Sequence, residues 1–125
     1  MPVLNFHARF SEAVKTMQKR QTIRANGKRR PPKEGEALYL YTGMRSQGCA
    51  KLAEAVCLSV EPIRINAKEK TVSMVRQGAV PFWHEIEREE VEALAAADGF
   101  AGVDDFFEFF AKQYGNGMSG VLIKW

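Results

Sequence analysis

The chain has 125 residues, of which 46% are hydrophobic and 26% are charged, and its formal net charge at pH 7 is +3. This length and composition predict one compact domain, residues 1–125, with an ordinary apolar core, and the lack of internal repeats and low-complexity tracts excludes a repeat architecture. No run of eighteen apolar residues and no long apolar N-terminal segment occurs, so we expect a cytoplasmic protein that does not interact with membranes.

Taken in chain order, the residue pattern predicts a short strand, a helix, a basic strand and loop, four further strands and two acidic helices. The predicted elements are a strand at 3–6, a helix at 9–17, a strand at 19–24, a loop at 26–35, strands at 37–42, 51–65 and 71–75, helices at 87–97 and 103–114, and a strand at 120–125. Small residues alternate through 51–65, which favours a tightly curved sheet, with a break or edge position at Pro62. We therefore expect an α+β fold in which five or six strands close into a compact barrel flanked by two or three helices.

The run from Lys19 to Arg24 contains an amine, a hydroxyl and two guanidinium groups within six residues. Such a set can grip an anion or attack a carbonyl. In a strand, Arg20, Thr22 and Arg24 lie on one face, and Lys19 joins them only if the corner before the strand turns it inward. The alternative is a polar strand face in water, with cations present for solubility.

Charge is strongly segregated along the chain. Residues 15–33 hold eight cations and no acid, whereas residues 85–108 hold nine acids and one base. This separation predicts that phosphate groups of an RNA or a nucleotide bind on the basic side, although an acidic helix in water explains most of the glutamates equally well. The residues predicted to bind that ligand are Arg20, Arg24, Lys28, Arg29 and Arg30.

The two cysteines, Cys49 and Cys57, have neither C-x-x-C spacing nor a histidine at metal-ligand spacing. A reducing cytosol keeps such residues as thiols. We therefore predict no zinc, no other metal and no cofactor.

Several segments together resemble the ASCH domains, a branch of the PUA-like RNA-binding barrels. They are Leu4 to Val14, Lys19-x-x-Thr22-x-Arg24, Gly35 to Tyr41, Ala53 to Val56, Asp98-Gly99-Phe100 and the closing strand to Trp125. The resemblance implies a PUA-like barrel and an RNA or modified-nucleoside partner.

The family signature is Gly-x-Lys-x-x-Glu-x-Arg, and here Met17 replaces the Gly and Thr22 replaces the Glu. A Thr at this place is similar to the subgroup of ASCH domains that act as amidohydrolases on acylated cytidine. The resemblance to that subgroup implies Lys19, Thr22 and an acid as the catalytic set. The acid matches Asp98, with Glu92 as the alternative. A binding module without catalysis and a ribonuclease remain open, because family membership does not choose a reaction.

Hydrolysis of an amide requires a nucleophile, a base and a group that stabilises an oxyanion. Thr22 supplies a hydroxyl, and Lys19 becomes a base when burial and neighbouring cations lower its pKa. Asp98 is predicted to activate water and Arg24 to hold the substrate or the developing charge. Asp98 also stands at a helix end before Gly99, where a carboxylate is disfavoured unless a cation offsets it, but Asp-Gly is an ordinary turn pair as well.

Overall fold

The computed structural model describes residues 2–125 and contains eight strands, three α-helices and one short 3-10 helix. A three-stranded sheet, in the order β1-β3-β4, consists of β1 (Val3–Phe6), β3 (Ala37–Thr42) and β4 (Ala50–Val56). A five-stranded sheet, in the order β2-β8-β5-β6-β7, consists of β2 (Gln21–Ala25), β5 (Ser59–Asn66), β6 (Thr71–Arg76), β7 (Phe82–Glu85) and β8 (Gly117–Lys124). The fold is α+β, as predicted.

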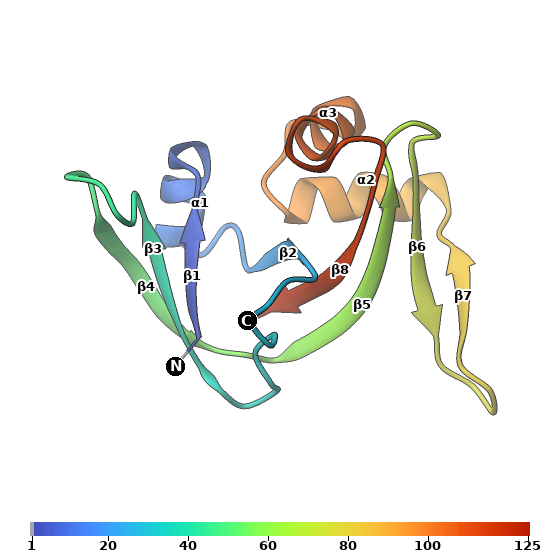
Figure 1. Ribbon diagram of the computed structural model, residues 1–125, viewed down its shortest axis with the longest axis horizontal. Helices are drawn as coiled ribbons and strands as arrows, with labels where there is room; N and C mark the ends of the chain where they lie inside the picture. Colours follow the sequence, from blue (N-terminus) through green and yellow to red (C-terminus); the bar gives the residue numbers. More distant parts are fainter. Residues whose placement is uncertain (1) are drawn as a thin grey trace.

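The two sheets stand next to each other, and β1 of the smaller sheet faces β2 of the larger sheet across a gap (Figure 1). The strand β1 pairs in parallel with β3, whereas all the other paired strands are antiparallel. Two helices, α2 (Arg88–Ala97) and α3 (Val103–Tyr114), lie together beside the larger sheet, and the 3-10 helix (Ala8–Phe10) leads into α1 (Ser11–Lys15) beside the smaller one (Figure 1).

The predicted closed barrel of five or six strands is wrong. Within residues 2–125, β1 and β2 are both edge strands and no hydrogen-bonded ladder joins them. The small residues of the 51–65 segment do not mark one strongly curved strand. The segment forms two strands, because β4 ends at Val56 and β5 begins at Ser59 in the other sheet. Between the two strands, the backbone N–H of Cys57 donates a hydrogen bond to the carbonyl of Glu36. The backbone N–H of Leu58 donates one to the carbonyl of Lys124. The segment therefore passes from one open sheet to the other instead of curving within a closed one.

The core lies between the sheets and the helices. Leu38 and Leu40 alternate inward along β3, and Phe106 and Phe110 lie one helical turn apart on the buried face of α3. Alternation in a strand and turn spacing in a helix each place apolar side chains on one face. Among residues 2–125 the longest helix has 12 residues, and none meets the length and hydropathy needed to cross a bilayer.

A sharp corner after α1 turns the chain into β2. Met17 has a φ of 67°, in the left-handed region that glycine adopts most readily. The backbone N–H of Lys19 then bonds to the carbonyl of Ala13 at 2.9 Å, which ties the corner to the preceding helix. Lys19 therefore lies before the strand, where the alternation of strand faces does not apply.

Candidate functional site

The side chain of Lys19 points into the protein and is 2% exposed. Its Nζ lies 3.2 Å from Oδ1 of Asp98 and also donates a hydrogen bond to the backbone carbonyl of Asp98. The ring centroid of Phe10 lies 4.7 Å from Nζ and that of Phe6 lies 5.9 Å away, and aromatic faces attract a cation. A buried charge requires such partners, so Lys19 and Asp98 function as one unit.

Asp98 directly follows α2 and is 3% exposed. The C-terminus of a helix carries partial negative charge, and Lys19 offsets it by binding both the carbonyl and the carboxylate. The next residue, Gly99, has a φ of 94°, and a Cβ there would lie 3.1 Å from Phe10 and 3.2 Å from the side chain of Lys19. The Asp-Gly pair therefore presents a carboxylate to Lys19 and leaves room for the lysine side chain.

Thr22 is buried near the start of β2, and its Oγ1 accepts a hydrogen bond of 3.1 Å from Nε of Arg24. The guanidinium of Arg24 also lies 4.8 Å from the ring centroid of Phe6, so it spans the gap from β2 to β1. A cationic donor favours the alkoxide form of a hydroxyl and leaves its proton free for a base. In the described part of the chain, residues 2–125, no hydrogen bond joins Lys19 to Thr22.

One cavity of about 250 Å³ is lined by all of these side chains. Its reactive lining groups are the charged side chains of Lys19, Arg24 and Asp98, the Thr22 hydroxyl, the His7 imidazole and the Tyr114 phenol. Aromatic rings from the segment after α2 and from α3 complete the wall, among them Phe100, Phe109 and Tyr114. Pockets for drug-sized ligands measure about 300–1,000 Å³, so this one accepts a group about the size of a single small ring.

Burial changes the protonation of both members of the ion pair. Removal from water raises the pKa of Asp98 to about 6, although Lys19, Gln21 and Arg24 oppose the change. Burial also lowers the pKa of Lys19 from the ordinary 10.5, and here the Asp98 carboxylate opposes the change. Loss of water disfavours the charged form of each group. Lys19 therefore gives up its proton more readily than a lysine on the surface does.

The other predicted binding residues occupy different places. Arg20 is exposed, its Nε donates to the carbonyl of Trp125 at 3.2 Å, and it lines neither this cavity nor its neighbour. Lys28, Arg29 and Arg30 line an adjacent, larger hollow. Of the two candidate acids, Glu92 lies on the exposed face of α2, pairs with Arg88 at 3.3 Å and is not among the residues that line the cavity.

Sequence reasoning missed several polar residues in the cavity lining and next to it. Strict strand alternation assigned Gln21 to the opposite face, yet its amide nitrogen lies 3.5 Å from Oδ1 of Asp98 because both faces of β2 are buried at this end. Asn5, His7 and Gln113 are among the lining residues, and Nε2 of Gln113 lies 2.8 Å from Nε2 of His7. These two residues are 106 positions apart, and nothing in their local sequence indicates the contact.

Among residues 2–125, no group of three His, Cys, Asp or Glu side chains is placed to hold a metal ion. Comparison with protein-family models, with curated proteins and with solved structures gave no significant match. The chemistry of the cavity must therefore be inferred from its own side chains.

Proposed function

We propose that the protein is a small amidohydrolase that removes an acyl group from the exocyclic amine of N4-acylated cytidine, with Thr22 as nucleophile and Lys19 as base. The observation that carries the proposal is the buried Lys19–Asp98 ion pair, which faces the same cavity as the Thr22 hydroxyl. Burying two charges costs free energy of folding because both lose their contacts with water. Charged groups whose pKa values are shifted by burial concentrate at functional sites.

The Asp98 carboxylate holds Lys19 in its charged form before the reaction, whereas burial lowers the pKa of Lys19 and so makes its neutral form easier to reach. In the first half of the reaction, Oγ1 of Thr22 attacks the acyl carbon and its proton passes to Lys19 in this neutral form. The bond between the acyl carbon and the cytosine amine then breaks, and Lys19 returns the proton to the leaving amine. Arg24, which already donates to Oγ1 of Thr22, stabilises the negative charge of the attacking oxygen.

In the second half, water attacks the ester formed on Thr22. The carboxylate of Asp98 accepts a proton from that water, the bond between the acyl carbon and Oγ1 of Thr22 breaks, and Asp98 passes the proton to Oγ1. The products are the free carboxylic acid and regenerated Thr22. Asp98 is suited to this step because its pKa of about 6 keeps it ionised at neutral pH while making it more basic than a surface aspartate.

Two features of the corner before β2 support the resemblance to the ASCH signature. Met17, which stands where that signature has Gly, keeps a left-handed backbone. Lys19, the signature lysine, is the residue that this corner directs into the cavity. The corner therefore retains the backbone geometry that a glycine permits, although the glycine itself is replaced.

A second candidate function is a binding module without catalysis. It is favoured by the hydrogen bond from Lys19 to the end of α2, because capping a helix is a purely structural role. In that case the basic loop holds RNA phosphates, and affinity for single-stranded RNA falls steeply as salt rises. A ribonuclease is tested by cleavage of the same RNA.

The proposal is tested by incubating the protein with N4-acetylcytidine and separating the products by chromatography. We expect cytidine and acetate in equal amounts. Intact N4-acetylcytidine together with salt-dependent RNA binding would instead establish the binding module, and RNA fragments would establish the ribonuclease.

The pH dependence of turnover provides a separate prediction. Because Asp98 must be ionised to take a proton from water, we expect turnover at saturating N4-acetylcytidine to fall about tenfold for each pH unit below about 6. Asp98→Asn should lose nearly all turnover, whereas Glu92→Gln, which changes an exposed carboxylate, should match the wild type. A profile that is flat from pH 5 to 8, measured where circular dichroism shows folded protein, would remove Asp98 from the mechanism.

A further inference from the structure

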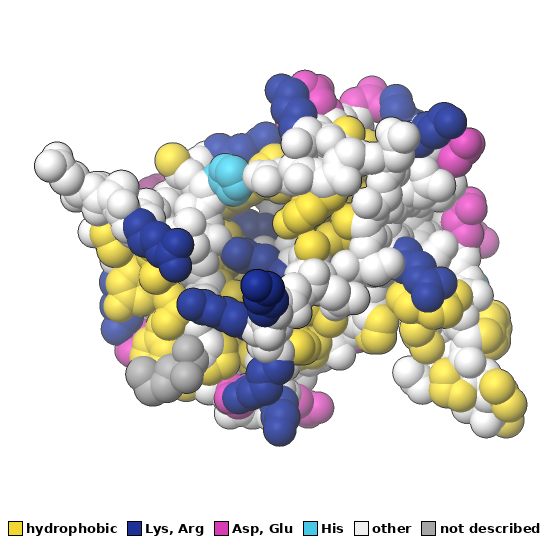
Figure 2. Space-filling view, in the orientation of Figure 1, with side chains coloured by type: hydrophobic (Ala, Val, Ile, Leu, Met, Phe, Trp, Pro, Cys, Tyr) yellow, Lys and Arg dark blue, Asp and Glu magenta, His cyan; other side chains and the backbone are white. Residues whose placement is uncertain are grey.

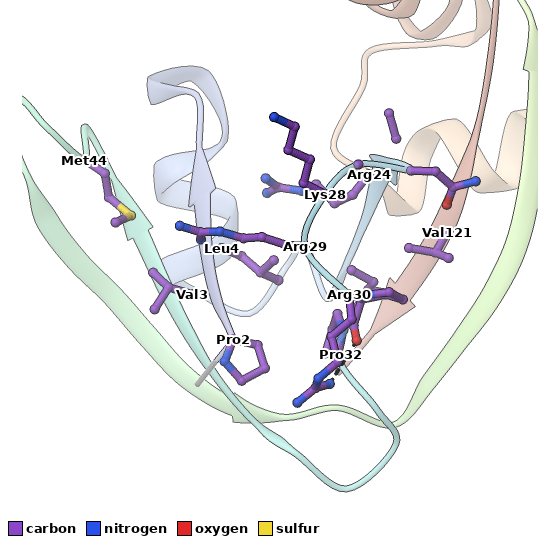
Figure 3. A pocket seen from close by; sticks show the side chains of 15 residues that line it. Pro2, Val3, Leu4, Arg24, Lys28, Arg29, Arg30, Pro32, Met44 and Val121 are labelled. Atoms are coloured by element: carbon purple, nitrogen blue, oxygen red, sulfur yellow. Dashed lines mark hydrogen bonds between the residues drawn. The ribbon is translucent and has the colours of Figure 1, made fainter.

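A second and larger hollow lies beside the catalytic cavity. It measures about 1100 Å³ and is bounded by the start of β1 on one side and by the chain from Arg24 to Pro32 on the other (Figure 3). Val121 and Ile123 of β8 also line it, so residues of both sheets border the hollow. The gap between the two sheets exists because β1 and β2 do not pair.

The hollow combines apolar walls with cations. Its charged lining residues are Arg24, Lys28, Arg29 and Arg30, and no acid is among the lining residues. Figure 2 shows Lys and Arg side chains gathered around the middle of this face, with acidic side chains placed mainly over the helices. Positive charge within a concave surface concentrates anions there.

Two of these cations are available to a ligand. Within residues 2–125, no acidic side chain pairs with Lys28 or Arg29, whereas Arg30 is held by both carboxylate oxygens of Glu36 at 2.8 and 2.9 Å. In Figure 3 the Arg29 side chain extends from the loop in the direction of β1, so its guanidinium lies over the hollow. Glu36 thus fixes the base of the loop, and Lys28 and Arg29 remain as free positive charges.

The hollow and the catalytic cavity adjoin each other at Arg24. Arg24 lines both of them. Two successive residues of β1 also lie on either side of the boundary, since Leu4 lines the hollow and Asn5 lines the cavity. A ligand whose small ring fills the cavity therefore extends past Arg24 into the hollow. The group that it places there meets the fork-shaped donors of the Arg29 guanidinium, which match phosphate oxygens, and the point charge of the Lys28 ammonium.

From this arrangement we infer that the substrate is a phosphorylated acylcytidine, with its base in the small cavity and its phosphate bound by Lys28 and Arg29 in the larger hollow. The inference rests on the proposed hydrolase function and adds the substrate class. The phosphate is supplied either by a free nucleotide or by the backbone of an RNA, since both present the same group.

The test compares N4-acetylcytidine with its 5′-monophosphate as substrates, and cytidine with cytidine 5′-monophosphate as ligands in calorimetry. Because charge-assisted hydrogen bonds from Lys28 and Arg29 stabilise the bound phosphate, we expect each 5′-monophosphate to exceed its nucleoside by about 10- to 100-fold in kcat/KM or in affinity. In Lys28→Gln/Arg29→Gln this ratio should approach one, and in the control Lys15→Gln/Lys68→Gln, which removes the same charge outside the hollow, it should stay as in the wild type.

The outcomes separate this inference from the hydrolase itself. Equal kcat/KM for both substrates, with equal affinity for both ligands, overturns the phosphate site and leaves the hydrolase standing. Absence of hydrolysis together with a preference for cytidine 5′-monophosphate that Lys28→Gln/Arg29→Gln abolishes retains the phosphate site and rejects the hydrolase. A trinucleotide with a central N4-acetylcytidine identifies the source, because faster turnover of the trinucleotide than of the monophosphate assigns RNA and the reverse assigns the free nucleotide.

Discussion

Thr22→Val will hydrolyse N4-acetylcytidine at least about a thousandfold more slowly than the wild type, because loss of a nucleophile removes the covalent route entirely. Valine has the shape of threonine without the hydroxyl, so the packing of β2 is kept. The hydrogen bond from Arg24 to Oγ1 of Thr22 is lost, but Arg24 retains its contact with the ring of Phe6. The measurement is kcat from the initial rate of cytidine release.

Thr22→Ser is the matched control for this prediction. It restores the hydroxyl and removes only a methyl group, so we expect it to keep activity within about tenfold of the wild type. Thermal unfolding of both variants reports whether either change affects the fold. Equal activity of Thr22→Val and Thr22→Ser would show that Thr22 is not the nucleophile.

Lys19→Met will destabilise the protein by about 3–5 kcal/mol, the usual cost of removing one partner of a buried ion pair. The change leaves the carboxylate of Asp98 buried without its cation and also removes the hydrogen bond to the end of α2. Methionine fills much of the volume of the lysine chain, so loss of packing contributes little. Urea unfolding at pH 8 measures the effect.

The pH dependence of this loss distinguishes charge from packing. Without Lys19, the pKa of Asp98 rises further above its already raised value, so the folded state binds a proton that the unfolded state releases. The difference in free energy of unfolding between the wild type and Lys19→Met should therefore be smaller at pH 5 than at pH 8. Lys15→Met, on the exposed end of α1, should change stability by less than about 0.5 kcal/mol. A loss at Lys19 as small as that at Lys15 would contradict the buried pair.

Local sequence predicted most of the individual elements, because each has its own signal. The continuous apolar and aromatic run from Ala37 to Thr42 marked β3, and the turn spacing of Phe106 and Phe110 marked α3. The strand β7 was not predicted, because Phe82 to Glu85 is short and lies at the edge of the sheet, where its pattern of exposed and partly buried residues is weak. Closure of the barrel was predicted wrongly, since whether β1 pairs with β2 depends on contacts between distant segments.

The candidate site was only partly predictable, because some of its residues are close in sequence and others meet only in the folded chain. The spacing from Lys19 to Arg24 is local and was visible in the sequence. The approach of Asp98 to Lys19 across 79 positions followed only from the family resemblance and from the unusual place of a carboxylate at a helix end. The contacts of Gln21 and His7 depend on tertiary packing and on the burial of both faces of β2, for which the sequence has no periodic signal.

Mass spectrometry of Asp98→Asn after incubation with N4-acetylcytidine tests the central claim most directly. Without the carboxylate that activates water, the ester on Thr22 should accumulate, so the peptide that contains Thr22 should carry an acetyl group and release it in hydroxylamine. The peptide from Asp98→Asn/Thr22→Val should stay unmodified. An unmodified Thr22 in Asp98→Asn, in a preparation whose wild type hydrolyses the substrate, would contradict the account.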